Sequence, residues 1–477
     1  MTRRRSPRWM WLPHPCSRFL RTGWVQTLAL ILMLAAFAFP ASAEWNEKVL
    51  YSFQGGSDGQ TPAGGVVFDK AGNLYGVTYE GGSTCPSPGC GTIFQLSPGS
   101  GGRWSESVLY DFNGNQGSRP FGGAIIDGNG NLYGTTGYGG SGQCKLFGDV
   151  VGCGVVWKLS PPTQKGGQWT YAVLYNFQGD KDGQIPNGDL TLDKAGNLYG
   201  ATLYGGGYGS CNAPYFQHCG TVFELCPPKE KGGEWSETVL SSFKGVADGE
   251  QFGDGANPNG GLLLDSGGAI YGTTYFGGNN QKNSCEGGVG GTGCGMVFRL
   301  VSRKGEGWKR QMLYRFQAGV NDGSNPAAGV TFGTDGKLYG TTYFGPANGF
   351  GIVFAITKPA GESQTPGTET VIYRFTDGTD GANPMSGLTF DTRGGEFYGT
   401  ASSGSGGSIY GDVFRLRPPA AQGERWTFDT LYGFATKSGG GAPAAKLVSG
   451  SEGNFYSTTQ AGGTGCNSCG TVFEVWP

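Results

Sequence analysis

One pattern recurs seven times in this chain of 477 residues: a Pro followed, after a nearly constant interval, by a Tyr. The interval is 13 residues in six copies and 14 in the sixth. The prolines are Pro62, Pro120, Pro186, Pro258, Pro326, Pro384 and Pro443, and the tyrosines are Tyr75, Tyr133, Tyr199, Tyr271, Tyr339, Tyr398 and Tyr456. Such a period indicates one repeated supersecondary unit, because units of this kind bury their apolar faces only by stacking on their neighbours.

Each copy is predicted to contain four β-strands. The first two form a hairpin, as in GVVFD-KAGN-LYGVT, where Asp69 closes an Asx turn and Gly72 takes a positive φ. A third strand, such as GTIFQL or GTVFEL, follows a loop of variable length.

The fourth strand alternates with a period of two, so every second side chain shares a face. The residues on that face are Trp45, Glu47, Val49, Tyr51 and Phe53 in the first such strand, and Trp104, Glu106, Val108, Tyr110 and Phe112 in the second. We expect these aromatic rings to pack between adjacent sheets, and the alternative is a stack that binds a ligand.

Four strands per copy and seven copies predict an all-β fold, a seven-bladed β-propeller with four-stranded blades. The rival fold is a β-solenoid. The ends favour the propeller, because residues 45–53 form a lone fourth strand and residues 470–475 a lone third strand. Pairing the two would close the ring, complete the last blade and remove two exposed edges.

The strings GNLYGTT, YGG and GTVF resemble the GloVer tandem repeats of secreted Gloeobacter and Verrucomicrobia proteins. The resemblance covers the chain from residue 44 onward. It implies export and a repeat architecture, but no activity. Many members of that family carry a C-terminal anchoring signal. Here the chain ends at Trp476-Pro477 without a hydrophobic tail, so we expect a released protein.

Composition excludes several classes of protein. Gly (94) and Pro (25) are abundant, but the glycines follow no triplet period and only 15% of residues are charged, so neither collagen nor a charge-expanded disordered chain fits. The first 43 residues hold six of the 34 basic residues and no acid, so the remainder has 28 basic and 36 acidic residues. That balance argues against nucleic acid as a partner.

The N-terminus has the pattern of a signal peptide. Six arginines precede an apolar stretch from about Leu28 to Phe39, and Ala41-Ser42-Ala43 is a small-residue cleavage pattern. We therefore expect residues 1–43 to be removed and residues 44–477 to form one propeller, secreted and with no membrane span after cleavage. A transmembrane helix is the alternative, but the apolar stretch is shorter than the ~20 residues a span needs.

Ten cysteines fall in pairs within the loops between the second and third strands. The pairs are Cys85 with Cys90, Cys144 with Cys153, Cys211 with Cys219, Cys285 with Cys294, and Cys466 with Cys469. Export predicts five local disulfides. Zinc binding or redox chemistry at Cys466–Cys469 are the alternatives. Cys226 has no partner in its loop and is predicted to be a free thiol.

An Asp-Gly pair recurs before the repeat prolines. The richest copies offer the carboxylates of Asp180 and Asp182, and of Asp377 and Asp380. Calcium, the one cofactor that the sequence suggests, would suit such oxygen ligands on Gly-rich loops. The alternative is a turn motif that recurs because the turn recurs.

The strand that follows each Pro is expected to line a central channel. Its first positions are mostly Ala and Gly, and the polar exceptions are Asn187, Asp189, Asn259 and Lys446. A second candidate ligand surface is a set of exposed aromatic residues after the second strand, Tyr79, Tyr138, Tyr204, Tyr275 and Tyr343. Flat rings beside polar groups are typical of sugar-binding sites, and packing against the next blade is the alternative.

No motif identifies a catalytic group, since residues 44–477 contain a single histidine, His218, and no GxSxG or HExxH pattern. The sequence therefore favours a monomeric binding scaffold for an extracellular polysaccharide or protein. The alternatives are a secreted glycoside hydrolase or polysaccharide lyase, which could act through carboxylates alone, and a structural component of the cell surface or matrix.

Overall fold

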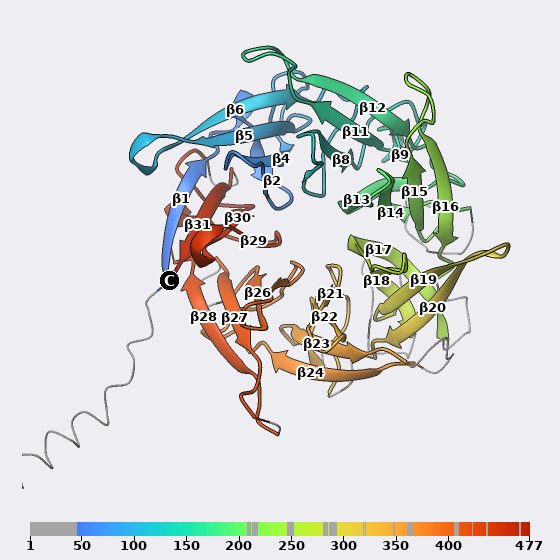
Figure 1. The fold of residues 1–477 in the computed structure, drawn as a ribbon, viewed down its shortest axis with the longest axis vertical. Helices are drawn as coiled ribbons and strands as arrows, with labels where there is room; N and C mark the ends of the chain where they lie inside the picture. Colours follow the sequence, from blue (N-terminus) through green and yellow to red (C-terminus); the bar gives the residue numbers. More distant parts are fainter. Residues whose placement is uncertain are drawn as a thin grey trace, which may run out of the picture. The chain divides into compact units, whose positions relative to one another are not determined.

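The structure is a computed structural model. It describes residues 45–207, 211, 218–245, 252–279, 285, 293–317, 319, 321–346, 349–359, 366–404, 410–421, 423–435, 437–466 and 469–477. The predicted signal peptide lies outside these ranges. The unit from Trp45 to Pro477 is a ring of seven small antiparallel sheets, one per repeat, as Figure 1 shows. The predicted seven-bladed β-propeller is confirmed.

The innermost strand of each blade lies at the centre of the ring and the fourth strand at its outside (Figure 1). The strands of the first three blades are β2 (Gln60–Pro62), β3 (Val67–Phe68), β4 (Leu74–Glu80), β5 (Thr92–Pro98), β6 (Trp104–Asp111), β7 (Ile125–Ile126), β8 (Leu132–Thr136), β11 (Val155–Ser160), β12 (Thr170–Asn176), β13 (Gln184–Leu192), β14 (Leu198–Tyr204), β15 (Thr221–Cys226) and β16 (Ser236–Ser242). In the first blade the innermost strand is split into β2 and β3, which both pair with β4.

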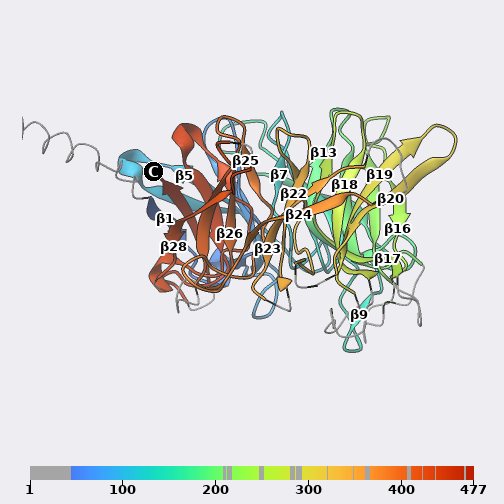
Figure 2. The ribbon, with the colours of Figure 1, turned by 90° about the horizontal axis from the view of Figure 1, so that it is seen from below.

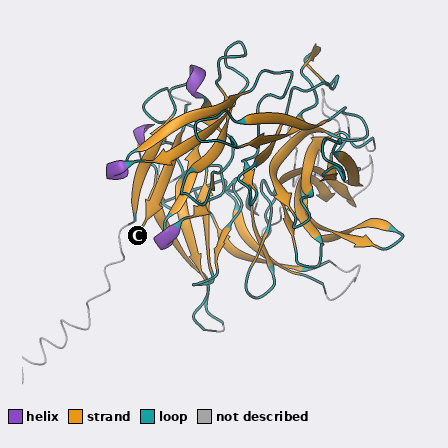
Figure 3. Cartoon of the chain, turned by 45° about the horizontal axis from the view of Figure 1, so that its top comes forward, coloured by secondary structure: helices purple, strands orange, loops and turns teal. Residues whose placement is uncertain are grey.

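The remaining blades repeat this order. Their strands are β17 (Phe252–Leu264), β18 (Ile270–Asn279), β19 (Met296–Arg303), β20 (Gly307–Arg315), β21 (Thr331–Phe332), β22 (Leu338–Thr342), β23 (Ile352–Thr357), β24 (Thr368–Arg374), β25 (Thr389–Asp391), β26 (Glu396–Ala401), β27 (Asp412–Arg417), β28 (Thr427–Gly433), β29 (Val448–Ser449), β30 (Phe455–Thr459), β31 (Thr471–Trp476) and β1 (Asn46–Ser52). Short 3-10 turns at Gly56–Asp58, Ser100–Gly102, Lys437–Gly439 and Ser451–Gly453 are the helical elements of the described residues (Figure 3).

The ring closes through the two ends of the chain. Strand β1 pairs antiparallel with β31, from Asn46 opposite Trp476 to Ser52 opposite Thr471. The first strand of the unit therefore becomes the outer strand of the last blade, as predicted. The Thr458 hydroxyl also donates to the carbonyl of Gly64 at 2.9 Å, which ties the last blade to the first near the channel.

The Tyr that ends each repeat interval stabilises the hairpin before it. Asp69 accepts hydrogen bonds from the backbone N–H groups of Ala71 (2.8 Å) and Asn73 (2.9 Å), and the Tyr75 hydroxyl donates to the same carboxylate at 3.0 Å. Gly72 has a φ of 85°, so the predicted Asx turn is confirmed. Asp127, Asp193 and Asp265 take the same place in the next three copies. In the fifth copy Gly333 holds this position, and the Tyr339 hydroxyl donates instead to Asp335, two residues later, at 3.0 Å.

The residue before each repeat Pro is left-handed, with φ between 52° and 57°. Its backbone N–H donates, at 2.7–3.0 Å, to a carbonyl at the start of the third strand of the preceding blade. The seven donors are Thr61, Arg119, Ile185, Asn257, Asn325, Asn383 and Ala442, and their acceptors are Cys469, Cys90, Cys153, Cys219, Cys294, Phe350 and Tyr410. Every blade is thus hydrogen-bonded to the next at the same point.

Three of these left-handed residues make a second bond between blades. The side-chain amides of Asn257, Asn325 and Asn383 donate to the carbonyls of Leu203, Tyr275 and Tyr343 at 2.8, 3.0 and 2.9 Å. Asn tolerates the left-handed region better than most residues do. Thr61, Ile185 and Ala442 occupy it without that advantage.

The fourth strands depart from the predicted simple alternation. Each of the seven has a register shift against the third strand, and in β6 the shift places Val108 opposite Phe94 and Tyr110 opposite Ile93, with Leu109 extra. A bulge changes which face the following side chains occupy. Val108, directly before the extra residue, is 37% exposed, unlike Trp104 and Glu106 on its predicted face, which are half-buried.

The aromatic side chains of the fourth strands pack between blades, as expected. Trp169 lies 5.8 Å from Tyr75 of the preceding blade, measured between ring centroids, and Tyr110 stacks on Tyr171 of the next blade at 3.8 Å. All four rings belong to one hydrophobic cluster, which spans the first and second blades.

All five predicted disulfides form, and Cys226 is the free cysteine of the described residues. They lie on the face of the ring that carries the loops between second and third strands, which we call the cysteine face. The hairpin of β9 (Lys145–Leu146) and β10 (Asp149–Val150) projects from it at the lower edge of Figure 2. In the described part of the chain no helix has the length and apolar character to cross a membrane.

The contact between blades predicts opposite effects for two substitutions. Asn325→Ala removes the amide bond to Tyr275 and should lower the free energy of unfolding by about 1 kcal/mol. Ala442→Asn should raise it by a similar amount, because Asn suits the left-handed φ and brings an amide to the equivalent carbonyl of Ser402. Chemical denaturation measures both. Ala442→Gly is the control, since it relieves the backbone strain without adding an amide, and a destabilised Ala442→Asn variant would contradict the account.

Candidate functional site

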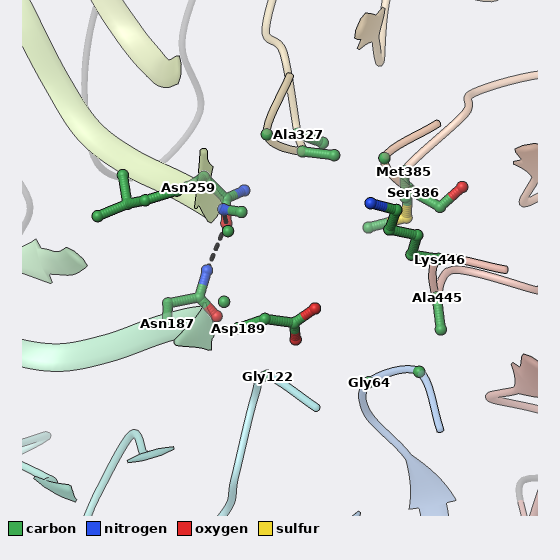
Figure 4. A pocket seen from close by; sticks show the side chains of 18 of the residues that line it. Gly64, Gly122, Asn187, Asp189, Asn259, Ala327, Met385, Ser386, Ala445 and Lys446 are labelled. Atoms are coloured by element: carbon green, nitrogen blue, oxygen red, sulfur yellow. Dashed lines mark hydrogen bonds between the residues drawn. The ribbon is translucent and has the colours of Figure 1, made fainter. Parts of the chain in front are cut away.

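A cavity of about 340 Å³ lies at the centre of the ring and receives residues from all seven blades. It is lined chiefly by the residues that directly follow each repeat Pro (Figure 4). The first of these positions holds Ala63, Phe121, Asn187, Asn259, Ala327, Met385 and Ala444, and the third holds Gly65, Gly123, Asp189, Gly261, Gly329, Gly387 and Lys446. All of these residues except Gly123 line the cavity, including the four predicted polar residues, Asn187, Asp189, Asn259 and Lys446. Their role in binding a ligand stays a prediction.

The glycines allow the seven backbones to converge. A Cβ atom on Gly64 would lie 2.1 Å from the backbone nitrogen of Gly123 in the next blade, and one on Gly329 would lie 2.1 Å from the carbonyl oxygen of Gly261. No side chain fits at such distances. The channel is therefore narrow and formed largely by backbone, so the few side chains that enter it define its chemistry.

Three polar side chains come from two neighbouring blades. The amide of Asn187, on β13, donates to the side-chain oxygen of Asn259, on β17. The Oδ1 atom of Asp189 accepts a hydrogen bond from the backbone N–H of Gly123 at 2.6 Å. These contacts fix the side chains of Asn259 and Asp189. The second oxygen of Asp189 and the amide group of Asn259 face the cavity (Figure 4).

Lys446 enters the cavity from the last blade, across from Asp189 and Asn187 (Figure 4). Its side chain is exposed to the solvent of the channel, and no hydrogen bond or ion pair reaches its amine from the residues that the structure describes. The surrounding ring of protein atoms lowers the pKa of this amine, and the carboxylate of Asp189 opposes that shift. Lys446 is thus a solvated cation on the wall of the cavity, with no hydrogen-bond or ion-pair partner among the residues that the structure describes.

An aromatic run lies beside the mouth of this cavity. The ring of Phe121, which lines the cavity, is 5.0 Å from the Tyr79 ring and 6.2 Å from the Tyr138 ring. The guanidinium of Arg119 lies 5.3 Å above Tyr79, and its Nη1 donates to the Tyr79 hydroxyl at 3.4 Å. Gly137 leaves the space that the Phe121 ring fills, because a Cβ there would approach that ring to 2.3 Å.

The remaining predicted tyrosines occupy equivalent repeat positions: Tyr204 ends β14, Tyr275 lies within β18 and Tyr343 directly follows β22. Tyr275 and Tyr343 each meet the following Phe edge to face, with centroids 4.7 Å apart. Burial raises the pKa of Tyr275 to about 12, with a smaller effect of Tyr343, and burial also raises the pKa of Tyr138, with smaller effects of Tyr79 and Tyr204. All five tyrosines are half-buried, so the expectation that they are exposed is only partly met.

The Asp-Gly motif acts as a turn cap in several copies. Asp182 accepts hydrogen bonds from the backbone of Gln178 (2.8 Å) and from the Tyr175 hydroxyl (2.9 Å), and Asp380 does the same with Thr376 and Tyr373, both at 2.9 Å. The carboxylate oxygens of Asp182 and Asp380 therefore already accept hydrogen bonds within the turn.

The other two calcium candidates are more open. Asp180 lies 3.7 Å from the His218 imidazole, and Asp377 is exposed. Across the described ranges, no three His, Cys, Asp or Glu side chains are grouped to hold a metal ion. Calcium binding stays a prediction.

One arrangement escaped the sequence analysis. Three half-buried glutamates of the fourth strands face an Asp in the turn of the preceding blade, and each leaves one carboxyl oxygen without a hydrogen bond among the described residues. The pairs are Glu106 with Asp58, Glu237 with Asp182 and Glu369 with Asp322. Burial, and next the neighbouring Asp, raises the pKa of Glu106 and Glu237 to about 7 and that of Glu369 to about 8. These carboxyl groups lie between blades rather than in the central cavity.

The fold and the cavity define a class, a seven-bladed propeller with a Gly-lined channel and a disulfide-bonded loop face. The sequence profile of the Gloeobacter/Verrucomicrobia repeat matches residues 37–210 and 283–477, and the chain belongs to that family. The predicted resemblance is confirmed. No protein of curated function matches the chain at a significant level.

Solved structures resemble the chain only distantly. The calcium structure of a Trichoderma reesei enzyme from a carbohydrate-active family has a TM-score of 0.42 at 11% identity, covering 91% of this chain and 96% of that one. A putative gluconolactonase scores 0.33 at 16% identity, over 67% and 80% of the two chains. Trypanosoma rangeli sialidase scores 0.38 at 12% identity, over 80% and 57%. These likenesses carry no argument about activity.

The half-buried glutamates predict a pH-dependent stability. The folded-state pKa values of these three glutamates lie above the ordinary value of 4.5. Their contribution to the stability of the folded state is therefore complete below pH 4.5 and is lost as the pH rises to between 7 and 8. The melting temperature should therefore be higher at pH 5 than at pH 8. Combining Glu106→Gln, Glu237→Gln and Glu369→Gln should reduce this difference. A part due to Glu47 should remain, because burial raises the pKa of that side chain to about 7 as well. Glu234→Gln, at an exposed position, should leave the difference unchanged. An equally steep dependence in the triple variant would refute the assignment.

Proposed function

We propose that this protein is a secreted scaffold that binds an extracellular polysaccharide at the mouth of its central channel. The observation that carries the proposal is the run of Tyr79, Phe121 and Tyr138 beside the cavity, with Arg119 over the first ring. Flat rings with polar edges suit the faces and hydroxyls of sugars. A groove of linked rings also suits a chain of sugars better than a small metabolite.

The acid groups of the cavity favour binding over hydrolysis. Glycoside hydrolases of the common type use two carboxyl groups about 5–10 Å apart. Among the described residues that line the cavity, Asp189 is the one carboxylate. The glutamates with raised pKa values are half-buried between blades and do not line this cavity.

Secretion is the second part of the proposal. Five disulfides on one face suit an oxidising compartment, and the N-terminal pattern of residues 1–43 suits export. Each disulfide closes a short loop. The second cysteine of each pair supplies the carbonyl that accepts the hydrogen bond from the residue before a repeat Pro. The disulfides would hold the rim of the proposed binding face in an environment without chaperones.

The aromatic run gives a direct test. Residues 44–477 should bind at least one member of an array of extracellular polysaccharides. Tyr138→Ala should weaken that binding up to about tenfold, since one aromatic contact contributes about 0.5–1.5 kcal/mol. Isothermal titration calorimetry on the array hit measures the change.

Phe147→Ala is the matched control, because Phe147 is 73% exposed on the same face but belongs to the β9–β10 hairpin, away from the cavity. It should leave binding unchanged. Loss of binding in Phe147→Ala with none in Tyr138→Ala would contradict the proposed site. Release of sugars from the bound polysaccharide would replace the scaffold by an enzyme, and absence of any binding would favour a protein partner or a structural role.

A further inference from the structure

The two charged residues of the channel occupy the same position of the repeat. The third residue after each Pro is Gly in five copies, and the exceptions are Asp189 in the third and Lys446 in the seventh. In a ring of seven, the third and seventh blades are separated by three blades on one side and two on the other. The two charges therefore lie at one depth on nearly opposite walls, and Figure 4 shows them facing each other across the cavity.

The amine of Lys446 has no structural task in the part of the chain that the structure describes. No carbonyl, hydroxyl or carboxylate there accepts a hydrogen bond from it, and Asp189 is too distant for an ion pair. The other positions of this ring show that Gly is sufficient for the fold. The amine is open to the channel, so an anion that enters the cavity can pair with it without breaking a contact within the protein.

The opposite wall offers different chemistry. Asp189 keeps one oxygen free to accept after its bond with Gly123, and the Asn259 amide keeps its donor groups after its oxygen accepts from Asn187. An acceptor and a donor side by side suit hydroxyl groups, which both give and receive hydrogen bonds. The cavity therefore pairs a cation on one wall with hydroxyl partners on the other, in about 340 Å³.

We propose that the channel binds a sugar that carries a carboxylate, with the carboxylate at Lys446 and the hydroxyls at Asp189 and Asn259. The inference rests on the proposed function, because it names the class of sugar that the aromatic mouth would deliver. Arg119, beside the mouth, is a second cation on the path into the cavity. A uronic acid at the end of a polysaccharide chain has this combination of groups.

The test compares a trisaccharide of hexuronic acid with its neutral hexose counterpart by calorimetry on residues 44–477. The wild-type protein should bind the acidic sugar at least tenfold more tightly. Lys446→Met keeps the length of the side chain and should abolish the preference, whereas Lys446→Arg should retain it. Lys70→Met is the matched control, since Lys70 is exposed at the hairpin of the opposite face, and its preference should equal that of wild type.

The outcomes separate this inference from the proposed function. If both sugars bind equally and Tyr138→Ala weakens both, the scaffold stands and the acidic specificity is wrong. A preference that survives in Lys446→Met also overturns the inference. Tighter binding of a free amino acid than of the uronate would show that the two charges select a zwitterion instead. Melting curves of each variant establish that it is folded.

Discussion

Seven hydrogen bonds between neighbouring blades, one before each repeat Pro, hold this ring together. Each requires a left-handed residue whose N–H reaches a carbonyl at the start of the preceding blade's third strand. The Gly that follows that carbonyl is needed as well, because a Cβ on Gly295 would lie 2.7 Å from the ring of Pro326. The Pro, the Gly of the third strand and the left-handed residue are therefore parts of one contact, and their recurrence along the sequence reflects its geometry.

This contact also positions the candidate site. Because the Pro of each blade is fixed against its neighbour, residues that directly follow it in all seven blades reach the central cavity. The frame is nearly symmetric and made of Gly and Ala. Substitutions within it, Asp189 and Lys446 above all, add charge without disturbing the contacts that close the ring. The fold supplies a repeated scaffold, and single positions of single repeats supply the chemistry.

The repeat interval, the hairpin with its Asx turn, the ring closure and the five disulfides could be predicted, because each depends on residues close in sequence or on a repeated pattern. The bulges of the fourth strands could not, because nothing in a run such as WSESVLYDF marks Leu109 as the extra residue. The facing of Glu369 and Asp322 also depends on how two blades meet. The four polar channel residues were predicted, but the opposition of Asp189 and Lys446 follows only from counting both residues from their prolines.

A crystal structure of residues 44–477 with a bound hexuronic acid oligosaccharide would show whether the central channel is the binding site. We expect density in the central cavity, with the sugar carboxylate within hydrogen-bonding distance of the Lys446 amine and the adjoining sugar against Tyr79 and Tyr138. Density confined to the outer rim of the ring, or to the hairpin of β9 and β10, with an empty channel would contradict it.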